Sequence, residues 1–243
     1  MPITRIFQAV PMSEQATIEL DEKASHHVMR VMRAKVGDPL TLFNGEGGEY
    51  HAIITELNKK SITVQLLQFE AREIESPIHI HLGQGIAKGE KMDFVVQKAV
   101  ELGVFAITAL ITERSNVRLD QEREIKKVSH WESIVVSACE QSGRNCLPKI
   151  AAPKTLAAWL TALKADRAYV LSPHVHETLA HEKLPQGSTI ALLIGPEGGL
   201  SPAEMEVAFA NGFKPLNLGP RVLRTETATI AAMTAMQCRY GDM

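Results

Sequence analysis

The sequence is poor in cysteine and has no long apolar run. Its three cysteines, Cys139, Cys146 and Cys238, are too few and too irregularly spaced for a disulfide framework or a zinc ribbon. No apolar run approaches the ~18 residues that a membrane span requires, and residues 1–10 lack the pattern of a secretory signal. We therefore expect a protein of the reducing cytoplasm, with no membrane partner.

An excess of charge of one sign is also lacking. The chain has 26 Lys and Arg against 28 Asp and Glu, which gives a formal net charge of -2. Residues 1–72 hold 8 basic and 9 acidic side chains, which leaves 18 and 19 for the rest. Because neither part is a polycation, any contact with nucleic acid must come from a local patch.

The sequence pattern changes near residue 72. Before this point, short segments of β-type composition are separated by turn residues, for example the NGEGG stretch at 44–48. The predicted strands are residues 3–10, 17–20, 40–43, 50–57 and 61–69, and one helix, residues 22–33, interrupts them. This order predicts a meander of hairpins that closes into a small barrel, in a domain of residues 1–72.

After Pro77, short apolar strands alternate with longer amphipathic segments. The predicted strands are residues 78–86, 106–112, 168–172, 190–195 and 215–218. The predicted helices are residues 91–103, 119–142, 156–165, 202–211 and 226–240. This alternation predicts an α/β domain over residues 73–243, with a mostly parallel sheet covered on both faces by helices.

The sequence defines one strand, turn and helix, within residues 190–212, especially clearly. The buried strand 190–194 runs directly into residues 195–199 (GPEGG). Ser201 is then a good N-cap for the following helix, Glu204 completes a capping box with it, and Gly212 is the expected C-terminal stop. The position of the turn between strand and helix is therefore fixed.

The glycine-rich turn 195–199 is a candidate ligand site. Ligands of open α/β sheets bind at the carboxyl ends of strands, where glycines let the backbone approach closely. The turn is neither a Walker A loop nor a dinucleotide fingerprint, because no Gly-Lys-Ser/Thr follows and Glu197 replaces the second glycine. That carboxylate disfavours a polyphosphate and is compatible with a nucleoside bearing a positive sulfonium or ammonium. The alternative is a sharp turn that binds nothing.

A second strand, loop and helix, at residues 216–227, carries two arginines. Thr225 can cap the final helix, while Arg221 and Arg224 project near the same sheet edge as the first turn. Two adjacent loops of this kind predict a single pocket. Taken alone, either loop is explained equally well as a surface turn beside solvated side chains.

A third stretch, residues 139–145, ends the long predicted helix with the side chains of Gln141, Arg144 and Asn145. These groups suit contacts with phosphates and base edges. The alternative is that Gly143 ends the helix and that its neighbours are solvated surface.

Together these motifs resemble the bacterial family that methylates uridine N3 in small-subunit ribosomal RNA, a family of SPOUT methyltransferases. The motifs that carry the resemblance are residues 193–201, 218–228 and 140–145, and it extends to residues 79–84, 88–92, 97–103 and 113–114. Their joint occurrence in this order over most of the chain makes the resemblance specific.

The resemblance implies a PUA-like β-barrel domain, a SPOUT α/β domain with a deep trefoil knot, and a homodimer. It implies S-adenosyl-L-methionine as cofactor and 16S ribosomal RNA, free or in the assembled 30S subunit, as partner. The cofactor-binding residues that it implies lie in three knot loops: Leu171, Ser172, Pro173, Gly195, Pro196, Glu197, Gly198, Gly199, Leu218, Gly219, Arg221, Val222 and Leu223.

Methyl transfer to uridine N3 requires that the base lose a proton, so the site must stabilise an anionic uracil. We assign this role to Arg224, and a phosphate-holding role to Arg221 or Arg114. Glu197 or Glu226 is the candidate general base. These assignments follow from the expected reaction and from the positions of the residues in the two loops.

RNA must also be held beside the target base, which has to be unstacked. The residues predicted to contact RNA are Arg5, His26, His27, Arg30, Arg33, Arg114, Gln141, Arg144 and Asn145. Arg30 and Arg33 lie three apart on the predicted helix and therefore share a face, although a solvated helix face gives the same pattern.

Other classes of function fit less well. His79 with His81, and His174 with His176, could each share a face of an extended segment, yet no Cys, Asp or Glu completes a metal motif, and we predict no metal. A non-catalytic RNA-binding protein of the same fold is the main alternative. A nicotinamide-linked reductase is disfavoured, because the dinucleotide fingerprint is missing.

Overall fold

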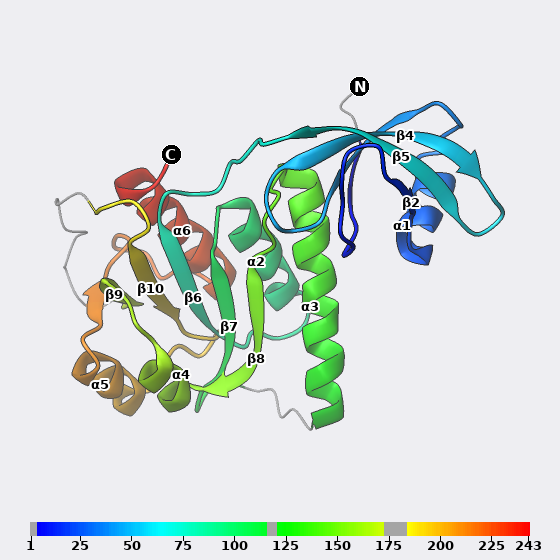
Figure 1. The fold of residues 1–243 in the computed structure, drawn as a ribbon. Helices are drawn as coiled ribbons and strands as arrows, with labels where there is room; N and C mark the ends of the chain where they lie inside the picture. Colours follow the sequence, from blue (N-terminus) through cyan, green and yellow to red (C-terminus); the bar gives the residue numbers. More distant parts are fainter. Residues whose placement is uncertain (1–3, 116–120, 173–183) are drawn as a thin grey trace. The chain divides into compact units, whose positions relative to one another are not determined.

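The computed structural model describes residues 4–115, 121–172 and 184–243, which divide into two units (Figure 1). The N-terminal unit runs to Glu75 and also takes in Cys139–Leu147, and the C-terminal unit consists of Ser76–Ala138 and Pro148–Met243. The division predicted at residue 72 lies close to the first boundary. A single boundary assigns Cys139–Leu147 to the C-terminal domain, whereas in the structure this segment belongs with the N-terminal unit.

The N-terminal unit is built on one sheet of five strands. In the order of the sheet these are β1 (Thr4–Phe7), β3 (Pro39–Phe43), β4 (Glu49–Leu57), β5 (Ile62–Glu70) and β2 (Thr17–Glu19). The antiparallel pairs β3–β4 and β4–β5 confirm the predicted hairpins. The prediction of a simple meander is wrong for β1, which pairs parallel to β3.

The helix predicted over residues 22–33 is shorter and has two parts. Helix α1 (Glu22–His26) is capped by Asp21, whose carboxylate accepts from the amide of Ala24, and it continues as the π-helical turn η1 (His27–Val31). Arg33 lies beyond this turn, in the left-handed region with φ 54°. The prediction that Arg30 and Arg33 share a helix face is therefore wrong, because the helix ends between them.

The C-terminal unit has a six-stranded sheet in which every neighbouring pair is parallel, as predicted. In order across the sheet, its strands are β11 (Lys214–Leu216), β9 (Arg167–Leu171), β10 (Thr189–Ile194), β6 (His79–Gly85), β7 (Ala106–Ile111) and β8 (Lys149–Thr155). Among the elements that the structure describes, β8 is the one that the sequence analysis missed. It is an edge strand of mixed exposure interrupted by Pro153, and proline is tolerated in sheets mainly at edges.

In the described part of this unit, five helices accompany the sheet: α2 (Glu90–Glu101), α3 (Gln121–Ser142), α4 (Leu156–Ala162), α5 (Pro202–Ala210) and α6 (Thr225–Tyr240). Helix α6 contacts β10 and packs on α2 (Figure 1). Helices α4 and α5 share a separate core cluster with β10, through Trp159, Leu193 and Ala208. Among the described residues, no helix is long and apolar enough to cross a membrane.

The sheet order brings distant segments to one edge. Strand β11 lies outside β9, yet the chain that follows it returns to the end of β10, where the hydroxyl of Thr225 donates to the carbonyl of Gly195 at 2.7 Å. The loop that follows β9 includes residues 173–183, so the predicted threading of the knot, with Pro173, lies outside the described residues.

Gly83 tests how closely α4 packs on the sheet. A Cβ at Gly83 would lie 2.5 Å from the ring of Trp159, so Gly83→Ala should lower the free energy of unfolding by about 1–3 kcal/mol. Urea denaturation followed by circular dichroism measures this cost. In a Trp159→Leu background the same substitution should cost clearly less, and an equal cost in both backgrounds would show that the ring does not set the constraint.

Candidate active site

The turn after β10 and the segment before α6 line one pocket of about 570 Å³, at the carboxyl edge of the sheet. This confirms the expectation that the two loops meet. The predicted residues that line the pocket are Arg114, Leu171, Ser172, Gly195, Pro196, Glu197, Gly198, Gly199, Val222, Leu223 and Arg224. Pockets that hold small ligands have roughly 300–1,000 Å³, so this one is large enough for a nucleoside-sized molecule.

Four predicted residues do not line this pocket: Leu218, Gly219, Arg221 and Glu226. The pocket wall is formed by the later part of that loop, so the first three belong to its outer part. Glu226 lies in the first turn of α6, and one of its carboxylate oxygens is buried without a hydrogen-bond partner among the described residues. Its assignment as a base that reaches the pocket is therefore not supported.

The turn at residues 195–199 is closed on itself and pressed against β6. A Cβ at Gly195 would lie 2.9 Å from the backbone of Gly199 and Leu200, and a Cβ at Gly85 would lie 2.5 Å from the backbone nitrogen of Pro196. The amide of Gly199 donates to the Pro196 carbonyl at 2.9 Å. Only glycine fits these two positions without movement of the backbone, so the glycines shape the turn and also bring it to the sheet edge.

Thr225 does not cap the final helix as predicted. Arg224 occupies the N-cap position without a side-chain cap bond, and helix α6 begins at Thr225. The Thr225 hydroxyl turns toward the neighbouring turn instead, where it bonds the Gly195 carbonyl. The two pocket loops are thus joined directly by a hydrogen bond that the local sequence pattern does not indicate.

Glu197 is held by lysine, which argues against a role as general base. Its carboxylate accepts from the amide of Lys88 and pairs with the ammonium of Lys91, both at 3.1 Å. Burial raises the pKa of Glu197, but these hydrogen bonds and the charge of Lys91 outweigh it, and the net pKa is lowered. A carboxylate with a lowered pKa is a weaker base, so these contacts disfavour this predicted role. Lys91, also a pocket residue, was missed.

Two arginines bring positive charge to the pocket. The guanidinium of Arg114 donates to the Gly198 carbonyl at 2.8 Å, and the turn that carries it is fixed because Glu113 donates its amide to Glu204 at 2.9 Å. Glu204 is also the partner of Ser201 in the predicted capping box. The guanidinium of Arg224 makes no hydrogen bond or ion pair with the described residues, and Arg224 lines the pocket.

Three of the residues predicted to contact RNA are committed to the interior of the N-terminal unit. Arg5 pairs with the buried carboxylate of Glu49 and donates to Asn145 at 2.5 Å. Arg144 forms a two-point pair with Glu75, and Asn145 donates to the carbonyl of residue 72 at 2.7 Å. These contacts disfavour direct RNA contact by Arg144 and Asn145, which are buried, and by Arg5, whose guanidinium is part-buried and paired with Glu49.

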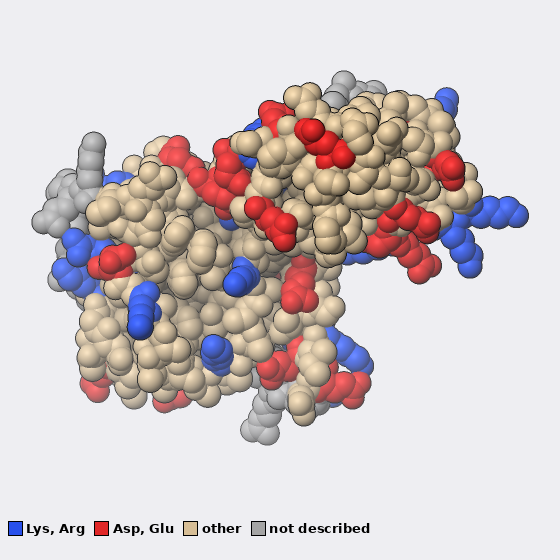
Figure 2. Space-filling model, in the orientation of Figure 1, with Lys and Arg blue, Asp and Glu red and all other residues tan. Residues whose placement is uncertain are grey.

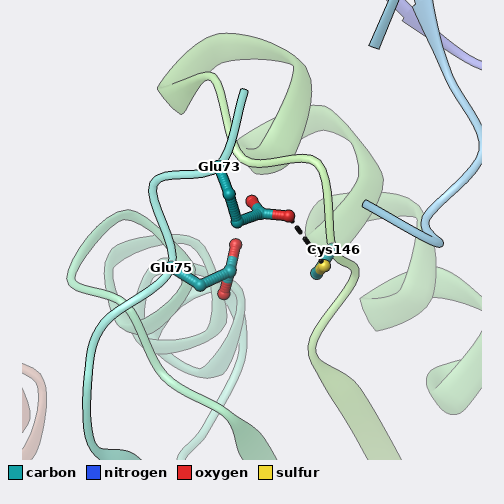
Figure 3. Close-up of side chains that lie close together, drawn as sticks. All are labelled: Glu73, Glu75 and Cys146. Atoms are coloured by element: carbon teal, nitrogen blue, oxygen red, sulfur yellow. Dashed lines mark hydrogen bonds between the residues drawn. The ribbon is translucent and has the colours of Figure 1, made fainter. Parts of the chain in front are cut away.

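The same network contains a cluster of possible metal ligands, Glu73, Glu75 and Cys146 (Figure 3). Burial, followed by the neighbouring carboxylate of Glu73, raises the pKa of the Cys146 thiol to about 11, and the thiol donates to Glu73 at 3.5 Å. Since Glu75 is also paired with Arg144, the observed contacts are those of an ion-pair network.

The exposed basic residues of the N-terminal unit lie elsewhere. A groove of about 640 Å³ is lined by Asp21, Glu22, Lys23, His26, Met29, Arg30, Lys59 and Lys60. It includes the predicted residues His26 and Arg30. His27, Arg33 and Gln141 are exposed but do not line it. Lys59 and Lys60, in the turn between β4 and β5, were not predicted as RNA contacts, because only the folded unit brings this turn beside α1. Charged side chains of both signs project from this part of the unit (Figure 2).

The two histidines of β6 pack against an aromatic ring. His79 and His81 both stack on the ring of Phe105, with centroid distances of 4.2 and 5.3 Å. Burial, and then the neighbouring His79, lower the pKa of His81, which favours a neutral ring. His174 and His176 lie outside the described residues.

A parallel α/β unit with a ligand pocket at its carboxyl edge, preceded by a PUA-like unit, defines an RNA methyltransferase of the SPOUT class. Residues 74–237 match the family model described as RNA methyltransferase domain, and residues 20–67 match the RNA methyltransferase PUA domain. This chain belongs to that RNA methyltransferase family.

Relatives extend the similarity over the whole length. Ribosomal RNA small subunit methyltransferase E of Buchnera aphidicola is 40% identical over 99% of this chain and 98% of its own. A structure described as a methyltransferase from Legionella pneumophila in complex with bound SAM is 42% identical, with TM-score 0.96 and complete coverage of both chains. Ribosomal RNA small subunit methyltransferase E from Neisseria gonorrhoeae, bound to S-adenosyl methionine, is 36% identical with TM-score 0.92, again over the full length of both.

Glu49 should make the N-terminal unit acid-sensitive. Burial raises the pKa of Glu49, but the hydrogen bond and charge of Arg5 and the charge of Arg72 outweigh it, and the pKa falls below the ordinary 4.5. A carboxyl with a lower pKa in the folded state stabilises that state when ionised, and this stability is lost as the pH falls below about 4.5. The protection factors of β4 amides against hydrogen exchange, which remove the intrinsic pH dependence of the exchange rate, should therefore fall on acidification more in the wild type than in Glu49→Gln.

The matched control is Glu70→Gln, because Glu70 forms an exposed pair with His51 and should alter exchange little. At neutral pH, Glu49→Gln should destabilise the unit by about 3–5 kcal/mol, since it leaves two arginines without a buried anion. Identical acid profiles for the wild type and Glu49→Gln would contradict this role of the carboxylate.

Proposed function

We propose that this protein transfers a methyl group from S-adenosyl-L-methionine to N3 of a specific uridine in 16S ribosomal RNA of the small subunit. The observation that carries the proposal is the pocket formed by the two sheet-edge loops, in a chain that resembles SAM-bound relatives over its full length. The transfer to 16S ribosomal RNA follows the names of the relatives. The choice of uridine N3 rests on the resemblance of the loop motifs.

The pocket suits a nucleoside-type cofactor that carries no phosphate. Its walls are largely backbone and apolar side chains, such as Leu171, Ile194 and Leu223, and the turn at 195–199 exposes backbone groups that can recognise an adenine or a ribose. When bound, S-adenosylmethionine supplies an electrophilic methyl group on a sulfonium centre. The protein's part is to hold donor and base in line, which can contribute ~7–11 kcal/mol.

The arginines stabilise the negative charge that develops on the base. Removal of the N3 proton leaves that charge on the uracil oxygens, and preorganised cationic donors stabilise it in the transition state. Arg224, whose guanidinium has no partner in the described part of the chain, is the group we assign to this charge. Arg114, held on the Gly198 carbonyl, lies on the same pocket and can bind an adjacent phosphate. Because the only pocket carboxylate in the described part of the chain is paired with Lys91, we assign the N3 proton to solvent.

The N-terminal unit supplies a second RNA contact in this proposal. The groove beside α1 is lined by two carboxylates, Asp21 and Glu22, by Met29, and by five basic side chains: Lys23, His26, Arg30, Lys59 and Lys60. Lysine and arginine bind phosphates largely without regard to sequence and so fix the position of the RNA. Specific choice of the uridine then falls to the pocket of the C-terminal unit.

The remaining expectations are also proposals. The family resemblance supports a homodimer that works in the cytoplasm, with free ribosomal RNA or the assembled 30S subunit as substrate. The alternative function, a non-catalytic RNA-binding protein, predicts that S-adenosylmethionine does not bind. Calorimetric titration of the purified protein with S-adenosylmethionine separates the two functions.

The role of Arg224 can be tested against a matched arginine in the same loop. Arg224→Ala should lower kcat/KM for methylation of small-subunit RNA by about 10²–10³-fold, because a donor to the anionic base is lost, while affinity for the cofactor stays near that of the wild type. Arg221→Ala should have little effect, since Arg221 does not line the pocket.

The readout is nucleoside mass spectrometry of 16S ribosomal RNA from cells that lack the protein and are complemented with each variant. N3-methyluridine should be restored by the wild type and Arg221→Ala, and not by Arg224→Ala. Full restoration by Arg224→Ala would refute the assignment of that arginine, and unchanged N3-methyluridine in cells without the protein would refute the reaction.

The basic groove should govern the salt dependence of RNA binding. Lys59→Glu with Lys60→Glu should weaken binding and reduce the slope of log affinity against log salt by about 1–2, because phosphate contacts release counterions. Lys35→Glu is the control, as Lys35 is an exposed lysine of the same unit outside the groove. An unchanged slope in the double variant would exclude the groove as an RNA contact.

A further inference from the structure

Gln84, near the end of β6, is a fully buried glutamine beside the pocket, with 0% of its surface exposed. Its amide nitrogen donates to the hydroxyl of Thr225 and to the carbonyl of Gly85, each at 3.0 Å, with a longer 3.4 Å contact to the Gly195 carbonyl. Its amide oxygen accepts from the hydroxyl of Thr229 at 2.7 Å. Every hydrogen-bonding group of this side chain is therefore used.

The partners of Gln84 belong to both pocket loops. Gly195 opens the turn after β10, while Thr225 and Thr229 lie one helical turn apart at the start of α6. The Thr225 hydroxyl donates a hydrogen bond to the Gly195 carbonyl at 2.7 Å, and the Thr229 hydroxyl also lies 2.9 Å from the carbonyl of Thr225. One side chain on β6 thus connects two segments that are about thirty residues apart in sequence.

The backbone around Gln84 is packed just as closely. The missing side chain of Gly85 leaves room for Pro196, and a Cβ there would lie 2.5 Å from the nitrogen and Cδ of that proline. The turn therefore cannot move toward β6. Movement away from β6 would break the bonds to Thr225 and Gln84 and leave buried polar groups without partners, which is costly.

We propose that Gln84 is a positioning residue for the methyl donor: it holds the turn 195–199 and the start of α6 at the spacing that the donor requires. The proposal rests on the proposed function. Gln84 does not itself line the pocket, so it acts through Gly195 and Thr225, which do. The role requires an amide, because the site needs a donor for Thr225 and Gly85 together with an acceptor for Thr229.

The test compares two buried glutamines. Gln237, near the other end of α6, is 1% exposed; its amide donates to the carbonyl of Leu102 and accepts from the hydroxyl of Ser76, both at 2.8 Å. Gln84→Met and Gln237→Met each remove an amide of the same size and burial. Gln84→Met should weaken S-adenosylmethionine binding in calorimetry by about tenfold or more, while Gln237→Met changes it by less than about twofold.

A second readout does not depend on the cofactor. Hydrogen exchange of the backbone amides in residues 194–200 and 225–229 of the ligand-free protein should be faster in Gln84→Met than in the wild type. In Gln237→Met, exchange in these two segments should match the wild type. The pair Thr229→Val and Thr229→Ser repeats the test with a milder change: valine should weaken cofactor binding, and serine, which keeps the hydroxyl, should restore it.

The possible results separate the two proposals. If the wild type does not bind S-adenosylmethionine, the proposed function fails, and the exchange data still decide whether Gln84 holds the loops. If the wild type binds and Gln84→Met keeps both its affinity and its slow exchange, the positioning role is overturned. Equal losses of affinity in Gln84→Met and Gln237→Met would also overturn it, because general loss of stability would then explain the effect.

Discussion

The pocket depends on the hydrogen bonds around one carbonyl oxygen, that of Gly195, at the start of the turn. The hydroxyl of Thr225 donates to it at 2.7 Å, and the amide of Gln84, which donates to Thr225, lies 3.4 Å from it. Gln84 and Thr225 are buried, and a buried polar group without a partner costs about 1–3 kcal/mol. The strand, the turn and the last helix must therefore fold together, and their meeting forms the pocket.

The N-terminal unit is organised in a similar way by a buried carboxylate that needs hydrogen-bond donors and positive charge. The carboxylate of Glu49 is buried, and Arg5 and Arg72 neutralise it. Asn145 bonds Arg5, and Arg144 pairs with Glu75, so a segment distant in sequence becomes part of the unit. The donor-rich composition of that segment, which suggests contact with RNA, is explained by these internal contacts.

Features set by neighbours in sequence could be predicted, and features set by distant partners could not. The capping box of Ser201 and Glu204 depends on residues three apart, and the structure has it as expected. The parallel sheet follows from the alternation of strands and helices. The hydroxyl of Thr225, in contrast, has a local use as a cap and a distant use on Gly195, and the structure takes the distant one. The pairing of Glu197 with Lys91 and the burial of Arg144 were missed for the same reason: the partner that satisfies each charge comes from another part of the chain.

The central claim is that the two sheet-edge loops form the binding site of the methyl donor. A crystal structure of the protein grown with S-adenosylmethionine tests it most directly. The account predicts that the donor lies between the turn 195–199 and residues 222–225, with its methyl group facing the side of the pocket that holds Arg224, and that the Gly195 carbonyl keeps its bond to Thr225. A donor bound elsewhere on the chain, with these loops unoccupied, would contradict the account.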